Sequence, residues 1–288
     1  MIKVIHCLFT LTILVGLSCS APKEKTIEEP QEEPPVQEPT KEEESPKELL
    51  KQAYQLFKEG NDAESIQLAE RVLAIGRETN NDTLIGKSLS SMCRNAQRNL
   101  DTTRLAELSN ELAKLSASSG DQQWMMYRAH MNAEMWRLIG DMDKAERFYD
   151  ESMRISSEIG ATGMFTIDHF NKSFVSVAKG DFETANALIK KYYELRKEAD
   201  ATSEDAYGLI ALAYLLEQQK NYPGAHEVAV VTRRLFNEQN LFPEPPDEKP
   251  LLMVEAKVKS ELDASEWQEI STQSVEESVS SLLEKYLE

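Results

Sequence analysis

Turn signals recur every 40 residues along most of this chain. Between them, apolar residues three or four positions apart predict helices. Glycine accepts the left-handed conformation at a helix end, and Asp or Asn accepts hydrogen bonds from the free amides of the next helix. A fixed period of this length is typical of stacked repeats and favours a solenoid before any other fold. The five turn pairs are Gly60-Asn61, Leu100-Asp101, Gly140-Asp141, Gly180-Asp181 and Lys220-Asn221.

Two columns of mostly small residues keep the same period. Seven residues before the turns stand Ala53, Cys93, Ala133, Ser173 and Ala213. Five residues after the turns stand Ser65, Leu105, Ala145, Ala185 and Ala225. Small side chains let two helix backbones approach closely. We therefore expect the columns to mark where the two helices of each hairpin cross.

Two stretches of the repeat, residues 131–155 and 170–195, resemble tetratricopeptide repeats. Each has the small residue of the first helix, the Gly-Asp turn and the alanine of the second helix in place. The family repeat has about 34 residues, so a 40-residue period implies longer helices. The resemblance implies an all-α, right-handed superhelical solenoid of five helical hairpins over residues 48–240. It says almost nothing about function.

The C-terminal region, residues 241–288, departs from the repeat. A proline-rich break is expected at 241–250, followed by helices over 251–262, 265–272 and 275–287. Atypical terminal helices cap the open end of a solenoid. We expect Trp267, Leu282, Leu283 and Tyr286 to cover the end of the fifth hairpin.

The N-terminus reads as a signal peptide, residues 1–18. Lys3 precedes an apolar run from Val4 to Leu17, which is short for a span of about 20 residues across a bilayer. Ser18-Cys19 then resembles the lipobox of bacterial lipoproteins, which implies lipidation of Cys19. Ser20 in place of Asp after that cysteine resembles an outer-membrane address. The alternative is an ordinary cleaved signal peptide in which the cysteine has no role.

The segment after the cysteine, residues 19–47, is predicted to be a disordered spacer. Residues 20–48 hold ten Glu, four Lys and six of the chain's eleven prolines. So few apolar side chains cannot offset the entropy lost on ordering. Such a segment would act as an extended spacer between a lipid anchor and the folded domain.

Charge and motifs argue against several function classes. The formal net charge of −18 disfavours binding to nucleic acid. The sequence has no phosphate-binding loop and no hydrolase or metalloprotease motif. His130, His169 and His226 lie on different repeats without the spacing of metal ligands, and neighbours such as Asp168-His169 point to different sides of a helix. We therefore expect no enzyme activity, metal or cofactor.

The concave face is the candidate binding site, because the first helix of each hairpin lines it in related solenoids. The register predicts a groove with polar residues in the middle and aromatic residues at its ends, in which Arg94 and Arg137 are exposed. For Phe170 and Phe174, a place in the core and a place in the groove are both open. The candidate residues are Tyr54, Arg94, His130, Glu134, Arg137, Phe170, Phe174 and Tyr214.

These features favour a membrane-tethered scaffold of the bacterial cell envelope. Its partners would be other envelope proteins or peptide segments. The alternative is a lipoprotein that binds a small ligand or glycan on a helical-repeat scaffold. Such proteins add long insertions to build the ligand site, and the constant 40-residue spacing leaves no room for them.

Overall fold

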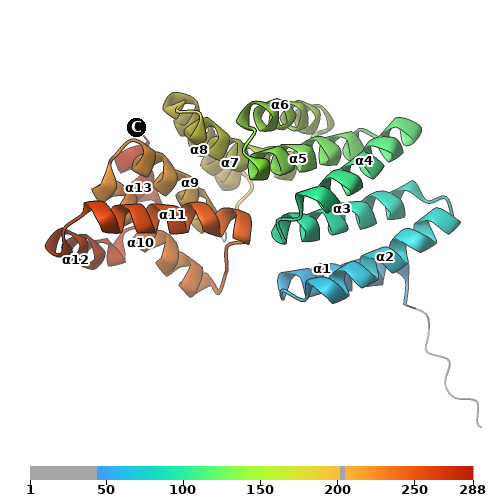
Figure 1. Cartoon of the computed structure of the whole chain (residues 1–288), viewed down its shortest axis with the longest axis horizontal. Helices are drawn as coiled ribbons and strands as arrows, with labels where there is room; N and C mark the ends of the chain where they lie inside the picture. Colours follow the sequence, from blue (N-terminus) through green and yellow to red (C-terminus); the bar gives the residue numbers. More distant parts are fainter. Residues whose placement is uncertain (1–43, 202–204, 288) are drawn as a thin grey trace, which may run out of the picture. The chain divides into compact units, whose positions relative to one another are not determined.

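A computed structural model describes residues 44–201 and 205–287 of the protein. The expected signal peptide, Cys19 and nearly all of the expected spacer lie outside the described residues. The described chain is helical, and from residue 46 to residue 261 consecutive helices pack side by side in chain order (Figure 1). This confirms the prediction of an all-α solenoid of helical hairpins.

Ten helices form the five hairpins of the array. The first helices of the hairpins are α1 (Pro46–Lys58), α3 (Asp82–Arg98), α5 (Gln122–Ile139), α7 (Thr162–Ala178) and α9 (Asp205–Gln218). The second helices are α2 (Asp62–Glu78), α4 (Thr102–Ser119), α6 (Met142–Ile159), α8 (Phe182–Glu198) and α10 (Tyr222–Gln239).

The turns of the array follow a 20-residue grid. The expected turn residues Gly60, Leu100, Gly140, Gly180 and Lys220 all have positive φ. The connections between hairpins, not expected from the sequence, end in the same way at Asn80, Gly120, Gly160, Asp200 and Asn240. One left-handed residue ends each helix by turning the chain back. Each 40-residue repeat therefore consists of two 20-residue halves, and each half is a helix that ends in a left-handed residue.

Side-chain caps start most of the second helices. Asp101, Asp141, Asp181 and Asn221 each accept a hydrogen bond from the backbone N–H three residues later. Asn61 makes no such side-chain bond, so the expected cap is absent from the first hairpin. The capped amides would otherwise have no partner within the helix.

Leu100 is a costly residue to place at its turn, because the Cβ of a leucine at φ 56° crowds the following carbonyl group. It is also 48 % exposed, so the side chain contributes little burial. We expect Leu100→Gly to stabilise the fold by about 1 kcal/mol. Thermal unfolding measures the change, and Gly140→Leu, at φ 93°, is the reciprocal control that should destabilise. A loss of stability in Leu100→Gly would show that the leucine side chain matters more than the strain.

Both columns of the sequence repeat lie at the centre of the hairpins. All ten positions have no exposed surface. In the second hairpin, the Asn95 side-chain amide also donates to the Ser65 hydroxyl of the preceding hairpin at 3.1 Å. The prediction that the columns mark the close helix crossings agrees with this complete burial.

The C-terminal helices are α11 (Pro245–Glu261), α12 (Ala264–Gln273) and α13 (Val279–Tyr286), with a short 3-10 turn η1 (Ser274–Glu276) before the last. The expected break at 241–250 is wrong, because α11 already begins at Pro245. The first turn of a helix has no intrahelical partner for its N–H groups, so proline fits there. Pro250 lies inside the helix.

The far end of the array is covered as expected. Leu282 is fully buried, and Trp267, Leu283 and Tyr286 pack against the cluster that contains α9 and α10. In the described part of the chain, no helix is both long enough and apolar enough to cross a bilayer.

Candidate interaction groove

A hollow of about 1020 Å³ lies along the first helices of the hairpins. Its walls come from α1, α3, α5 and α7, from the end of α8, from Tyr207 of α9 and from the segment that leads into α11. The volume is at the top of the range usual for ligand pockets. The residues that line it include Tyr54, Lys58, Arg94, Arg98, Tyr127, His130, Ile167, Phe170, Phe242, Glu244 and Asp247.

Tyr54 and Arg94 lie on the groove wall, where the sequence register places them. Tyr54 is 48 % exposed. The Arg94 guanidinium carbon lies 5.4 Å from the centre of the Tyr54 ring, and the Lys58 ammonium lies 5.3 Å from it. An exposed ring flanked by two cations is the kind of surface that anchors a partner.

The predicted aromatic residues of the far end belong mainly to the core. Phe170 and Phe174 are 7 % and 4 % exposed and pack edge to face with their ring centres 5.0 Å apart. Phe170 also borders the hollow, whereas Phe174 stacks on Tyr214 at 6.2 Å. Neither Phe174 nor Tyr214 is among the residues that line the hollow. For Phe170 and Phe174, the sequence left a place in the core and a place in the groove open, and the structure places both side chains in the core.

Arg137 is not an exposed groove residue, contrary to the prediction. Its side chain is 8 % exposed, and that of Glu134 is fully buried. Arg137 donates to the Glu134 carboxylate at 2.7 Å, and the Gln97 amide donates to the same oxygen at 2.7 Å. The Tyr149 hydroxyl donates to the other oxygen. Neither Glu134 nor Arg137 lines the hollow, so this ion-pair network forms the floor beneath it, as a buried charge needs partners. The Arg137 Nε is buried there without a hydrogen-bond partner.

The network changes the pKa of its members. Burial alone would raise the pKa of Glu134, but the charges of Arg137 and His130 and the Tyr149 hydroxyl lower it overall. Burial and the Glu134 charge raise the pKa of Tyr149. Glu134 is therefore a carboxylate, and Tyr149 a neutral donor, over the physiological range.

His130 pairs with Asp168 of the next hairpin. The His130 Nδ1 and the Asp168 carboxylate are 2.7 Å apart, and both side chains are buried. Burial lowers the pKa of His130, but the charge and hydrogen bond of Asp168 raise it overall. Asp168 is next to His169 in the sequence, but neighbours in a helix point to different sides. The histidine that Asp168 pairs with is His130 of the preceding hairpin, and the sequence spacing did not predict this pair.

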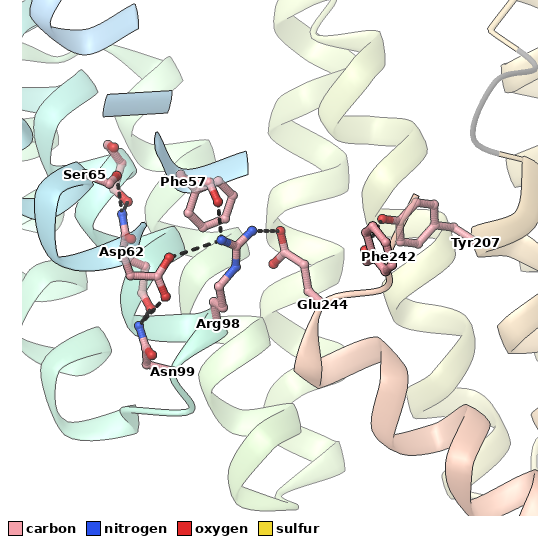
Figure 2. A network of polar contacts seen from close by, with 10 residues as sticks. Phe57, Asp62, Ser65, Arg98, Asn99, Tyr207, Phe242 and Glu244 are labelled. Carbon is pink, nitrogen blue, oxygen red and sulfur yellow. Dashed lines mark hydrogen bonds and ion pairs between the residues drawn. The ribbon is translucent and has the colours of Figure 1, made fainter. Parts of the chain in front are cut away.

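The start of α11 reaches across the array to α3, which sequence reasoning missed. Glu244 accepts from Arg98 at 3.1 Å, over 146 residues of chain (Figure 2). Arg98 also donates to Asp62 at 3.1 Å and to the Phe57 carbonyl, and its guanidinium carbon lies 3.5 Å from the centre of the Phe57 ring. Asp247 lies 3.8 Å from Arg137. These contacts make α11 a wall of the groove as well as a terminal cap.

Asp247 carries the clearest pH dependence of the groove. The pKa of Asp247 is raised to about 7, because burial outweighs the opposing charge of Arg137 and the charges of Glu134 and Glu244 add to the effect of burial. Burial also raises the pKa of Glu244. A carboxyl whose folded pKa is raised binds more protons in the folded than in the unfolded state. Its contribution to stability therefore falls as the pH rises from about 4 to about 7.

We expect Asp247→Asn to gain stability relative to wild type as the pH rises. The difference should be small near pH 4 and grow by about 1.4 kcal/mol for each pKa unit of the shift, up to about pH 8. Thermal unfolding at several pH values measures it. Asp82→Asn, which changes an exposed carboxylate at the start of α3, is the control. A variant that becomes less stable than wild type at pH 8 would show that the attraction to Arg137 outweighs burial.

No metal centre is evident in residues 44–201 and 205–287, where no group of three or more His, Cys, Asp or Glu side chains could hold an ion. The thiol of Cys93 is buried, which raises its pKa to about 12 despite nearby arginines. It is a packing residue in the first small column.

Comparison with known proteins identifies the fold alone. No family model matches the chain, and no curated protein matches it. The chain is similar to the apo form of RapI, with 16 % identity over 76 % of this chain and 87 % of that one, at a TM-score of 0.52. It is also similar to BtubC from P. vanneervenii, with 17 % identity over 84 % of this chain and 94 % of that one, at a TM-score of 0.51.

Proposed function

We propose that this protein is a lipid-anchored interaction scaffold of the bacterial cell envelope whose groove binds a segment of another envelope protein. One observation carries the proposal, namely a hollow of about 1020 Å³ with an exposed tyrosine set between two cations. Solenoids offer long concave surfaces of this kind to extended or helical peptide segments. The described site has no feature that points to a reaction.

The anchor is proposed from the sequence of residues 1–47. An apolar run, Ser18-Cys19 and a Glu- and Pro-rich stretch follow one another in the order of signal peptide, lipidated cysteine and spacer. Cys19→Ala should move the protein from the membrane fraction to the soluble fraction. A variant that stays with membranes would rule out the lipid as the tether. Ser20 supports the outer membrane as the address.

Site-specific photo-crosslinking in cells tests the groove. A benzoylphenylalanine at position 54, on the groove wall, should capture a partner, and adding Arg94→Glu should reduce the yield. The same probe at Ile139 is the control, because Ile139 is 52 % exposed and does not line the hollow. Equal capture from both positions would rule out the groove as the binding surface.

Binding of a small ligand or glycan is the second candidate function. It is favoured by the start of α11, which adds a further wall to the groove and so makes it more like a pocket. A thermal-shift screen against sugars and short peptides separates the two, because a ligand stabilises the state that it binds. Stabilisation by a sugar and by none of the peptides would favour this candidate.

A further inference from the structure

Three cations gather on the part of the groove wall formed by α1 and α3. Lys58 and Arg94 flank the Tyr54 ring, and Lys87 shares a second hollow of about 230 Å³ with Arg94 and Tyr54. No Asp or Glu lines that second hollow. Within the described residues, none of the three cations has a carboxylate at ion-pair distance. In a protein of net charge −18, these three cations form no ion pair of their own, although Glu244 and Asp247 line the first hollow with Lys58 and Arg94, and the charge of Arg94 acts on Glu244.

Arg98, the next cation on the same wall, shows that this surface can bind a carboxylate. Arg98 binds the carboxylate of Glu244, and Glu244 has an extended backbone, with φ −70° and ψ 155°, between two prolines. Phe242 precedes it, 76 % exposed at the rim of the hollow, and its carbonyl accepts from Tyr207 at 3.2 Å (Figure 2). The chain's own segment, which is extended at Glu244, therefore presents an aromatic residue and a carboxylate to the groove.

We propose that the partner segment is of the same chemical class, an extended acidic peptide with an aromatic residue. Its carboxylates would pair with Lys58, Lys87 and Arg94, and its aromatic side chain would lie against Tyr54 and Tyr127. This rests on the proposed function, because it names the class of segment that the groove takes. Charge complementarity requires a negatively charged peptide, since a basic peptide would bring like charges together on this wall.

The groove is already arranged for such a ligand. The two cations beside Tyr54 rest on its ring, which limits the side-chain entropy that they lose on binding. Tyr127 and Trp124 stack with their ring centres 6.1 Å apart and line the second hollow. Trp124 is almost fully buried beneath the half-buried Tyr127, so an aromatic side chain of the ligand would meet the Tyr127 ring next to the charges.

Fluorescence polarisation with three labelled peptides tests the inference on the folded protein. The peptides share one Phe-Pro core and differ only in four flanking residues, which are Glu, Gln or Lys. We expect the Glu peptide to bind about tenfold more tightly than the Gln peptide at low salt. The difference should shrink as salt screens the charges. The Lys peptide should bind weakest.

Charge reversal on the wall supplies the matched variants. Lys58→Glu with Arg94→Glu should weaken the Glu peptide by at least about tenfold, since two attractive pairs become repulsive. Lys114→Glu with Lys190→Glu changes the same charge at exposed positions of α4 and α8 and should leave the affinity unchanged. Thermal unfolding checks that all variants are folded. Equal binding of the Glu and Gln peptides, or no binding by any of them, would overturn the inference.

The crosslinked segment from cells separates this inference from the proposed function. A captured segment with acidic and aromatic residues supports both. A captured segment that is neutral or basic upholds the groove as a binding site and overturns its acidic specificity. Capture that does not depend on the groove overturns the proposed function itself, whatever the peptides show.

Discussion

Arg137→Met should lower the free energy of unfolding by about 3–5 kcal/mol, the cost of leaving one partner of a buried ion pair without the other. Glu134 would have no exposed surface and only Tyr149 and Gln97 as donors, so its carboxyl would either remain charged without its cation or take up a proton at a cost. For a chain of this size the midpoint of thermal unfolding should fall by roughly 10 °C. Urea unfolding followed by circular dichroism measures the free energy directly.

Two companion variants isolate the cause. Arg147→Met removes an exposed arginine from α6 and should change stability by less than about 0.5 kcal/mol. Adding Glu134→Gln to Arg137→Met removes the stranded charge, so the double variant should recover part of the loss. If Arg137→Met alone is as stable as Arg147→Met, water must reach Glu134 and solvate its carboxylate.

Gly86→Val should cost about 3 kcal/mol, because the position has no room for a side chain. A Cβ on Gly86 would lie 2.4–2.6 Å from three ring atoms of Trp124. The ring is 2 % exposed and cannot move aside easily. The helices α3 and α5 would have to separate at the place where they form the second hollow. Thermal unfolding should show the loss, and peptide affinity should fall with it.

Gly163→Val is the control for this substitution. Gly163 is also helical, in the first turns of α7, but a Cβ there meets no atom within 4 Å. The change should be less than about 1 kcal/mol, set by helix propensity alone. Trp124→Ala should itself cost about 3–5 kcal/mol, and combining it with Gly86→Val should cost less than the sum. Additive losses would show that Gly86 and Trp124 are not in contact.

The repeat could be predicted from the sequence because its cause is local. Each turn needs one residue that tolerates positive φ, and each hairpin crossing needs a small residue, so both leave a mark at a fixed spacing. The other half-period has similar marks in Asn80, Gly120, Gly160 and Asn240, which also end helices with positive φ. The start of α11 was missed since proline fits a first helical turn as well as a break.

The floor of the groove could not be predicted in the same way. Tyr54 and Arg94 line the hollow at the positions that the register gives them, on the first helices of neighbouring hairpins. Buried Arg137 contacts Glu134 on its own helix, Phe174 of the next hairpin and Asp247, which comes from a helix beyond the last repeat and follows no period. Likewise Phe174 is covered by Tyr214 of the next hairpin. Contacts between elements far apart in the chain leave no pattern in a single sequence.

The contact between Arg98 and Glu244 has a consequence for how the array unfolds. In an ordinary solenoid each unit touches only its neighbours, so the stability is a sum of nearest-neighbour terms and the ends fray independently. Here the second hairpin is joined to a helix beyond the fifth. Fraying of α11 then removes support from α3 directly, without first unfolding the hairpins between them. Melting of the terminal helix and of the N-terminal hairpins should therefore be coupled, and the array should behave as one cooperative unit.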